Sequence, residues 1–309
     1  MTDRQMEALL EFPGNRPVDV VIDTDTFNEV DDQFALAYLL KNSQKLRLQA
    51  VYAAPFCNEK AATAREGMEK SYQEILKVLD LAEAPAYKEC VFKGADRFLE
   101  DPRAPGISDA SQDLIRRAMD HSPASPLYVI GIAAATNIAS ALLQRPEIRD
   151  RIVIIWLGGS AYHRMEQEEF NLIEDVPAAQ ALFNSGAPLV QLPCWGVVEH
   201  FTVSKSELEQ YLLPANPLCQ YLAANVIREV GSYSRDLCWS KTIWDVTAVA
   251  WLLNDGGRFM EDQLVRAPVP LKAGYEFPDG RHLMRYVRHI QRDALVSDLF
   301  QTLMKGGRL

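Results

Sequence analysis

Five carboxylates packed into ten positions are the residues of this chain with the clearest potential for chemistry: Asp23, Asp25, Glu29, Asp31 and Asp32. Like charges that share one crevice raise one another's pKa, and a hard divalent cation relieves that repulsion. A set of oxygen ligands favours Ca²⁺ or Mg²⁺ over zinc or copper. The cluster therefore predicts a divalent-cation site. The alternative is that two of these acids cap a helix and that water solvates the others.

The elements that must position these carboxylates alternate along the chain between strands and helices. Residues 18–22 are a largely β-branched run, typical of a strand buried on both faces, and a helix is expected over 31–40. Further apolar runs at 128–130, 152–157 and 189–192 are each expected to be strands. This order predicts an α/β fold with an open, mostly parallel, Rossmann-like sheet and helices on both faces. Such sheets bind ligands outside the carboxyl ends of their strands, which is where the carboxylates lie.

No internal repeat or flexible linker divides the chain. We therefore expect one domain over residues 17–309, preceded by a short N-terminal helical extension at 1–16. Apolar residues in this extension recur at near-helical spacing until a Pro-Gly pair at 13–14 ends it.

Composition excludes several classes of protein. The chain has 309 residues, of which 48% are hydrophobic and 24% charged, as in a soluble globular protein and unlike a disordered one. With 42 acidic and 32 basic residues, it is not expected to bind nucleic acid. Its five cysteines indicate neither a disulfide framework nor a zinc site, and no apolar run reaches the length of a membrane span. We expect no membrane partner and a cytoplasmic location.

Several segments, taken in order, resemble the inosine-uridine-preferring nucleoside hydrolase family. No single segment is decisive, but the ordered set is specific and spans about residues 18–304. The segments that carry the resemblance are Asp23-Thr24-Asp25 with Asp31-Asp32, Lys93-Gly94-Ala95-Asp96-Arg97, Thr136-Asn137-Ile138-Ala139, Gly158-Gly159 followed by Glu169-Phe170-Asn171, and Trp244-Asp245.

The resemblance implies the nucleoside hydrolase fold and Ca²⁺-dependent hydrolysis of the N-glycosidic bond of ribonucleosides, giving free base and ribose. The expected partner is a small-molecule nucleoside, and the expected assembly is a homodimer or homotetramer. The transition state resembles an oxocarbenium ion, which anionic oxygens stabilise. The implied ligands of the ion are Asp25, Asp32, Asp245 and the backbone carbonyl of Thr136. Asp25 would also accept a proton from the attacking water. The implied substrate contacts are Asp31 and Asn171 at the ribose hydroxyls, Glu169 at the 5′-hydroxyl and Asn58 at the sugar.

Two features depart from the family pattern. The spacer between Asp25 and Asp31 has five residues, two more than usual, so that either Asn28 or Glu29 contacts the ligand or the loop bulges outward. Trp244 replaces the histidine that many members use as the acid for the leaving group, as in purine-preferring members. An indole cannot donate that proton but can stack on a purine, so Trp244 is expected to bind the base, unless it is a core aromatic.

The second wall of a stacking site is left open by the sequence. Its candidates are Phe27, Trp195, Tyr233 and Trp239.

Two other functions stay open. Asp-x-Asp after an apolar strand also begins a class of phosphohydrolases, but that pattern requires Thr or Val where this chain has Phe27. The altered loop and the missing histidine also fit a riboside-binding protein of the same fold without catalytic activity.

Overall fold

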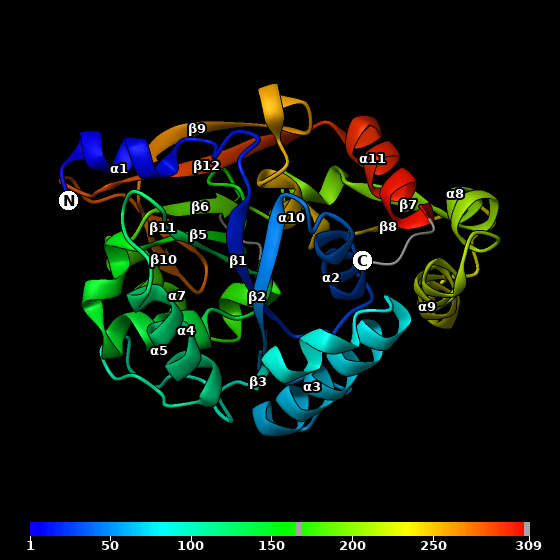
Figure 1. The fold of residues 1–309 in the computed structure, drawn as a ribbon, viewed down its shortest axis with the longest axis horizontal. Coiled ribbons are helices and arrows are strands. Elements are labelled where there is room, and N and C mark those ends of the chain that lie inside the picture. Colours follow the sequence, from blue (N-terminus) through cyan, green and yellow to red (C-terminus); the bar gives the residue numbers. More distant parts are fainter. Residues whose placement is uncertain (165–167, 306–309) are drawn as a thin grey trace.

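An eight-stranded sheet forms the centre of the computed structural model, which describes residues 1–164 and 168–305 (Figure 1). Neighbouring strands are parallel throughout, except for the last two, which are antiparallel. The expected open, mostly parallel sheet is confirmed. In spatial order the strands are β3 (Val91–Lys93), β2 (Leu46–Ala53), β1 (Val18–Thr24), β4 (Leu127–Gly131), β5 (Ile152–Leu157), β6 (Leu189–Leu192), β12 (Leu283–Ile290) and β9 (Met260–Arg266).

Helices cover both faces of this sheet, as its strands require. Along β1, Val20 and Ile22 enter one hydrophobic cluster and Val21 enters the other, so the strand is buried on both sides. The helices of the first cluster are α1 (Asp3–Leu10), α2 (Asp32–Lys41), α3 (Ala64–Leu81), α9 (Pro217–Tyr233), α10 (Val246–Trp251) and α11 (Arg292–Met304). The helices of the second cluster are α4 (Asp109–Met119), α5 (Thr136–Gln144), α6 (Phe170–Ile173) and α7 (Val176–Asn184).

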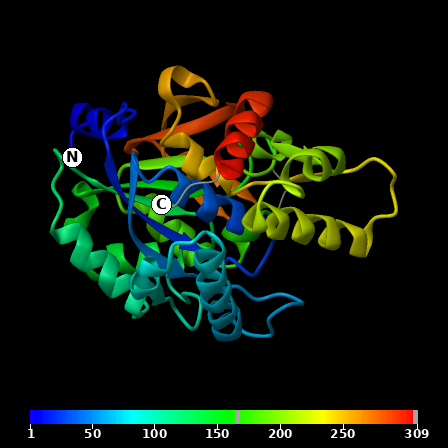
Figure 2. The same cartoon turned by 45° about the vertical axis from the view of Figure 1, so that its right-hand side comes forward.

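Two small two-stranded antiparallel sheets lie outside the main sheet. They pair β7 (Thr202–Ser204) with β8 (Ser240–Thr242), and β10 (Val269–Leu271) with β11 (Gly274–Glu276). A short helix, α8 (Lys205–Glu207), follows β7. The segment between α9 and β8 projects from the side of the molecule in Figure 2.

The N-terminal extension packs onto the main body. Helix α1 buries Met6, Leu9 and Leu10 in the first cluster, and the Arg285 side chain on β12 donates a hydrogen bond to the Leu10 carbonyl. Within the described residues, no helix combines the length and the apolar character that a membrane span requires.

The packing of helix α2 in the core fixes the positions of Asp31 and Asp32 at its start. Phe34 is fully buried in the first cluster, two positions after Asp32. We expect Phe34→Ala to lower the free energy of unfolding by about 3–5 kcal/mol, because it leaves a cavity in a packed core. Urea unfolding followed by circular dichroism measures the change.

A matched control is Tyr233→Ala, which removes an aromatic side chain that is 66% exposed. We expect the control to change the free energy of unfolding by less than about 0.5 kcal/mol. A loss below about 1 kcal/mol in Phe34→Ala would contradict the role of this residue in fixing α2.

Candidate active site

A cavity opens at the carboxyl ends of the central strands, where doubly wound sheets bind ligands. Four residues at or just after the ends of β1, β4, β5 and β6 line this cavity. They are Asp25, Ile132, Leu157 and Cys194, in that order. The cavity has a volume of about 90 Å³.

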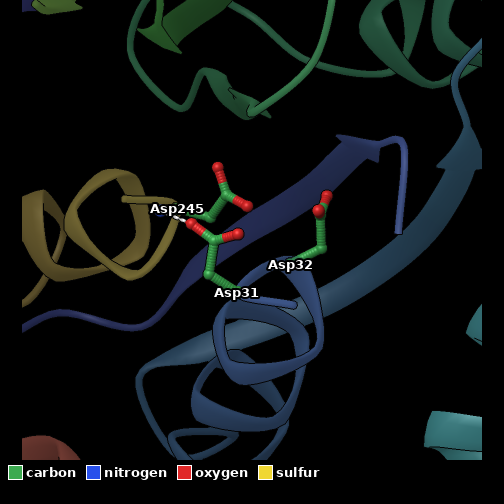
Figure 3. Close-up of side chains that lie close together, drawn as sticks. All are labelled: Asp31, Asp32 and Asp245. Atoms are coloured by element: carbon green, nitrogen blue, oxygen red, sulfur yellow. Dashed lines mark hydrogen bonds between the residues drawn. The ribbon is translucent and has the colours of Figure 1, made fainter. Parts of the chain in front are cut away.

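Three aspartates meet in this cavity from the starts of two helices (Figure 3). Asp31 and Asp32 precede and begin α2, and Asp245 precedes α10. Oxygen atoms of the three carboxylates lie within 4.8 Å of one another. The backbone N–H of Asp245 donates a 3.3 Å hydrogen bond to Asp31 Oδ2, which ties the two helix starts together.

These carboxylates do not serve as helix caps. Neither Asp31 nor Asp245 makes a side-chain hydrogen bond to the first turn of its helix. Asp175, by contrast, accepts a 2.9 Å hydrogen bond from the Ala178 N–H at the start of α7. The alternative that the clustered acids are caps and solvated charges is therefore wrong for Asp31, Asp32 and Asp245, all of which are buried.

Burial and mutual repulsion raise the pKa of the clustered carboxyls. Burial raises the pKa of Asp32 to about 6. Burial also raises the pKa of Asp25, with further contributions from the charges of Asp32 and Glu174. The pKa of Asp245 rises through burial and then through Asp31 and Asp32. No Lys, Arg or His is among the cavity-lining residues of the described chain, so this donor set fits a hard divalent cation.

Asp25 lies in the same cavity but outside the group of three. Its Oδ2 accepts a 2.9 Å hydrogen bond from Asn28 Nδ2, and Asn28 Oδ1 accepts one of 2.7 Å from Asn58 Nδ2. Asn58 does not line the cavity. The amide of Asn58 is directed to Asn28 and reaches Asp25 through that residue, and its contact with the sugar stays a prediction.

The longer loop after Asp25 turns inward. Asn28 and Glu29 both line the cavity, whereas Phe27 does not and is 39% exposed. Glu29 forms a 2.6 Å ion pair with Lys241 on β8, and Lys60 Nζ donates a 2.5 Å hydrogen bond to the Asn28 carbonyl. Of the two alternatives for this loop, the structure shows the one that brings it to the cavity.

Thr136 lies away from the cavity, which corrects the expectation that its carbonyl is a metal ligand. It is the first residue of α5, so its carbonyl is directed into the next turn of that helix. Its hydroxyl donates a 2.7 Å hydrogen bond to Asp175. The residue of this segment that lines the cavity is Ile132, directly after β4.

Backbone N–H groups hold the carboxylate of Glu169 at the cavity wall. This carboxylate accepts hydrogen bonds from Gly159 at 2.6 Å, Asn171 at 2.9 Å and Leu172 at 3.0 Å. Gly159 has a φ of +73°, a conformation that favours glycine and that turns its N–H toward Glu169. The Asn171 amide donates a 3.1 Å hydrogen bond to the Leu157 carbonyl. Both Glu169 and Asn171 line the cavity, where a polar ligand would meet them.

Two tryptophans form the aromatic part of the wall. Trp244 and Trp195 line the cavity, and their ring centroids lie 5.2 Å apart at an interplanar angle of 68°. Trp195 is thus the one of the four candidate residues that joins Trp244 at the cavity, since Phe27, Tyr233 and Trp239 are not among the lining residues.

Sequence reasoning did not assign Ile132, Cys194 or Lys241 to the site. The first two follow strands, so the rule that ligands bind at carboxyl ends would have identified them. Lys241 has no such signal, because its partner Glu29 lies 212 positions away in the sequence.

The chain is similar in sequence to known ribonucleoside hydrolases. A model of the family described as inosine-uridine preferring nucleoside hydrolase matches residues 20–296. The pyrimidine-specific ribonucleoside hydrolase RihA of Salmonella typhimurium is 25% identical over 262 residues, covering 76% of this chain and 79% of the relative.

Solved structures share the fold. The plant nucleoside hydrolase PpNRh1 has a TM-score of 0.73 and 19% identity, and the match covers 94% of this chain and 100% of the plant chain. A purine-preferring ribonucleoside hydrolase from Gardnerella vaginalis has a TM-score of 0.73 and 21% identity, with 93% and 98% of the two chains covered. The chain belongs to the inosine-uridine preferring nucleoside hydrolase family and is an enzyme that hydrolyses nucleosides.

Proposed function

We propose that the enzyme is a Ca²⁺-dependent N-glycosidase of ribonucleosides that releases free base and ribose and favours purine or purine-like bases. The observation that carries this proposal is the union, in one cavity, of buried aspartates and a pair of tryptophans. The aspartates suit a cation and the ribose, and the tryptophans suit an aromatic base.

The donors that would hold the ion are oxygen atoms at the floor of the cavity. They are the carboxylates of Asp25, Asp31, Asp32 and Asp245, with the backbone carbonyl of Ile132 in place of the Thr136 carbonyl. When bound, Ca²⁺ would supply Lewis-acid activation of water and an anchor for vicinal hydroxyls.

Side chains of the enzyme would accept the proton, orient the ribose and stabilise the transition state. Asp25 would accept the proton of the attacking water, and Asn28 holds that carboxylate in orientation through its 2.9 Å hydrogen bond. Asn171 and Glu169 would orient the ribose hydroxyls, with Asp31 beside them. The carboxylates would stabilise the positive charge that develops on the ribosyl ring as the C1′–N bond breaks.

The base would lie against the indole of Trp244, whose stacking favours a large aromatic ring. The names of the relatives differ on this point, since RihA is called pyrimidine-specific and the Gardnerella vaginalis enzyme purine-preferring. The pair formed by Trp244 and Trp195 supports a preference for purine over pyrimidine nucleosides.

We further propose a cytoplasmic homodimer or homotetramer that acts on a small nucleoside and binds neither nucleic acid nor membranes. The net charge of −10 supports the absence of a nucleic-acid partner, because phosphate backbones bind clustered Lys and Arg.

The direct test is to incubate the protein with Ca²⁺ and a panel of ribonucleosides and to follow free base and free ribose by chromatography. Release of both products from at least one nucleoside supports the proposal. Release of inorganic phosphate from phosphate esters would instead support a phosphohydrolase, and tight binding of ribosides without base release would support a binding protein.

Calcium binding is expected to release protons. Because burial raises the pKa of Asp32 to about 6, its carboxyl is partly protonated at pH 6, and a bound cation displaces that proton. Titration calorimetry in MES and in Bis-Tris, two buffers that hold pH 6 and differ in ionisation enthalpy, should show proton release on calcium binding at pH 6, and less as the pH rises above the raised pKa of Asp32.

Asp245→Asn should weaken calcium binding at least about tenfold, because it removes a charged ligand. In the unmodified protein, a heat of calcium binding that is the same in both buffers at pH 6 would contradict the placement of the ion among these carboxyls.

Asp25→Asn is expected to lower kcat at least about 100-fold with the fold intact, because the amide cannot accept a proton from water. Steady-state kinetics and circular dichroism measure the two properties. Asp19→Asn is the matched control on β1, the strand that Asp25 directly follows, since Asp19 pairs with Arg47 and is not among the cavity-lining residues. Near-normal kcat in Asp25→Asn would remove Asp25 from its role as the base.

Trp244→Ala is expected to lower kcat/KM for purine nucleosides by roughly 5- to 150-fold, the range of one lost stacking interaction of about 1–3 kcal/mol. The loss should be smaller for p-nitrophenyl riboside, whose leaving group needs no help from stacking. Equal losses for the two substrates would show that Trp244 is structural.

A further inference from the structure

We propose that this active site is built for ribonucleosides whose base carries a positive charge, such as N7-alkylated purine ribosides and N-ribosylpyridinium compounds. The inference rests on the proposed N-glycosidase function and narrows its substrate class. Three observations carry it: the charge of the cavity wall, its pair of tryptophans and its lack of an acid for the leaving group.

The cavity wall is strongly acidic. Six carboxylates line it, and Lys, Arg and His are absent from its described lining residues. One divalent cation balances two of these charges, and Lys241 balances Glu29 through their 2.6 Å ion pair. Any of the remaining carboxylates that is ionised attracts a cationic base and not a neutral one, and no described lining residue carries a positive charge that would oppose this attraction. The carboxylates are Asp25, Glu29, Asp31, Asp32, Glu169 and Asp245.

The aromatic wall also favours a cation. Trp195 and Trp244 lie with their ring centroids 5.2 Å apart in an edge-to-face arrangement. Tryptophan is the aromatic side chain with the strongest attraction for a cation over its face. An aromatic cation that enters between the carboxylates and this pair therefore stacks on an indole and keeps its charge near anionic oxygens.

No His, Lys, Arg or Tyr is among the described cavity-lining residues. The remaining acidic groups in the described wall are carboxyls that would hold the ion and the ribose, Glu29 in its ion pair with Lys241, and the thiol of Cys194. The thiol of Cys194 is buried and forms a hydrogen bond with Glu169. A neutral purine leaves as an anion unless it is protonated, and such protonation is a major part of base departure.

A cationic base needs no such proton. When its C1′–N bond breaks, the bonding electron pair neutralises the positive ring, and the base leaves as a neutral molecule. The oxygen of water forms the new bond to C1′, and the displaced proton passes to Asp25. The products are ribose, neutral base and one proton, so charge and atoms balance without a second acid.

The test compares inosine with 7-methylinosine, a matched pair that differs by one methyl group and one positive charge. In the wild-type enzyme kcat/KM should be at least about 100-fold higher for 7-methylinosine, as expected when no acid assists the neutral base. Part of this ratio reflects the intrinsic lability of the charged compound. A substitution in the protein does not alter that lability, so the change in the ratio between wild type and variant isolates the contribution of the enzyme.

We expect Trp195→Leu to lower the ratio by roughly 3- to 30-fold, the range of a cation–aromatic interaction. Trp195→Phe, which keeps an aromatic face, should restore part of it, and Glu29→Gln should lower it by about threefold or more. Trp239→Leu is the control, because Trp239 is a partly buried tryptophan outside the cavity-lining residues, and it should leave the ratio unchanged.

p-Nitrophenyl riboside separates this inference from the function on which it rests. If that compound is hydrolysed but 7-methylinosine is no better than inosine, or if Trp195→Leu and Glu29→Gln leave the ratio unchanged, the preference for charged bases is overturned and the N-glycosidase stands. If no riboside in the set is hydrolysed, the proposed function fails and the inference fails with it.

Discussion

Repulsion among buried carboxylates is the constraint around which this structure is arranged. Asp25, Asp31, Asp32 and Asp245 are each at most 5% exposed and line one cavity. Such a cluster persists only where the surrounding fold holds it firmly and where protons or a cation offset its charge. The fold holds the cluster firmly, since β1 is buried on both faces and α2 and α10 pack against each other beside it. The oxygen-rich donor set suits a cation that would offset the charge of the carboxylates.

Hydrogen bonds around the cluster extend this support outward. Asn28 links Asp25 to Asn58, and the Glu29–Lys241 ion pair links the same loop to β8. The loop after Asp25, two residues longer than the family pattern, is thus both part of the cavity wall and a bridge between segments distant in the sequence. Elsewhere in the cavity wall, three backbone N–H groups fix the carboxylate of Glu169. Trp195 and Trp244 form the aromatic surface of the wall, so we expect these two residues to determine which base binds.

Much of the fold was predictable from local patterns. The apolar run at 189–192 is β6, the expected helix at 31–40 is α2 with a shift of one residue, and the sheet has the expected mostly parallel order. These features follow from periodicity and from side chains that end helices, which act over a few residues. Asp25, Asp31 and Asp32 were predictable for the same reason, since they lie close together after one strand, whereas Asp245 followed only from the family resemblance.

The contacts made by tertiary packing were not predictable in this way. A segment that matches a family pattern does not reveal which of its residues lies at the cavity, and the structure brings Ile132 there and not Thr136. Asn58 was expected at the sugar, and its hydrogen bond with Asn28 in the lengthened loop was not foreseen. Trp195 was one of four candidates, and only the packing of the segment after β6 against α10 selects it.

Locating the ion tests most directly whether these carboxylates bind a cation. Crystals grown with Ca²⁺ and measured at long wavelength would show its position by anomalous scattering. We predict one peak per chain, surrounded by the carboxylates of Asp25, Asp31, Asp32 and Asp245. A cavity that holds no ion at saturating Ca²⁺, or an ion bound at another place in the chain, would contradict the claim that these carboxylates are gathered for a cation.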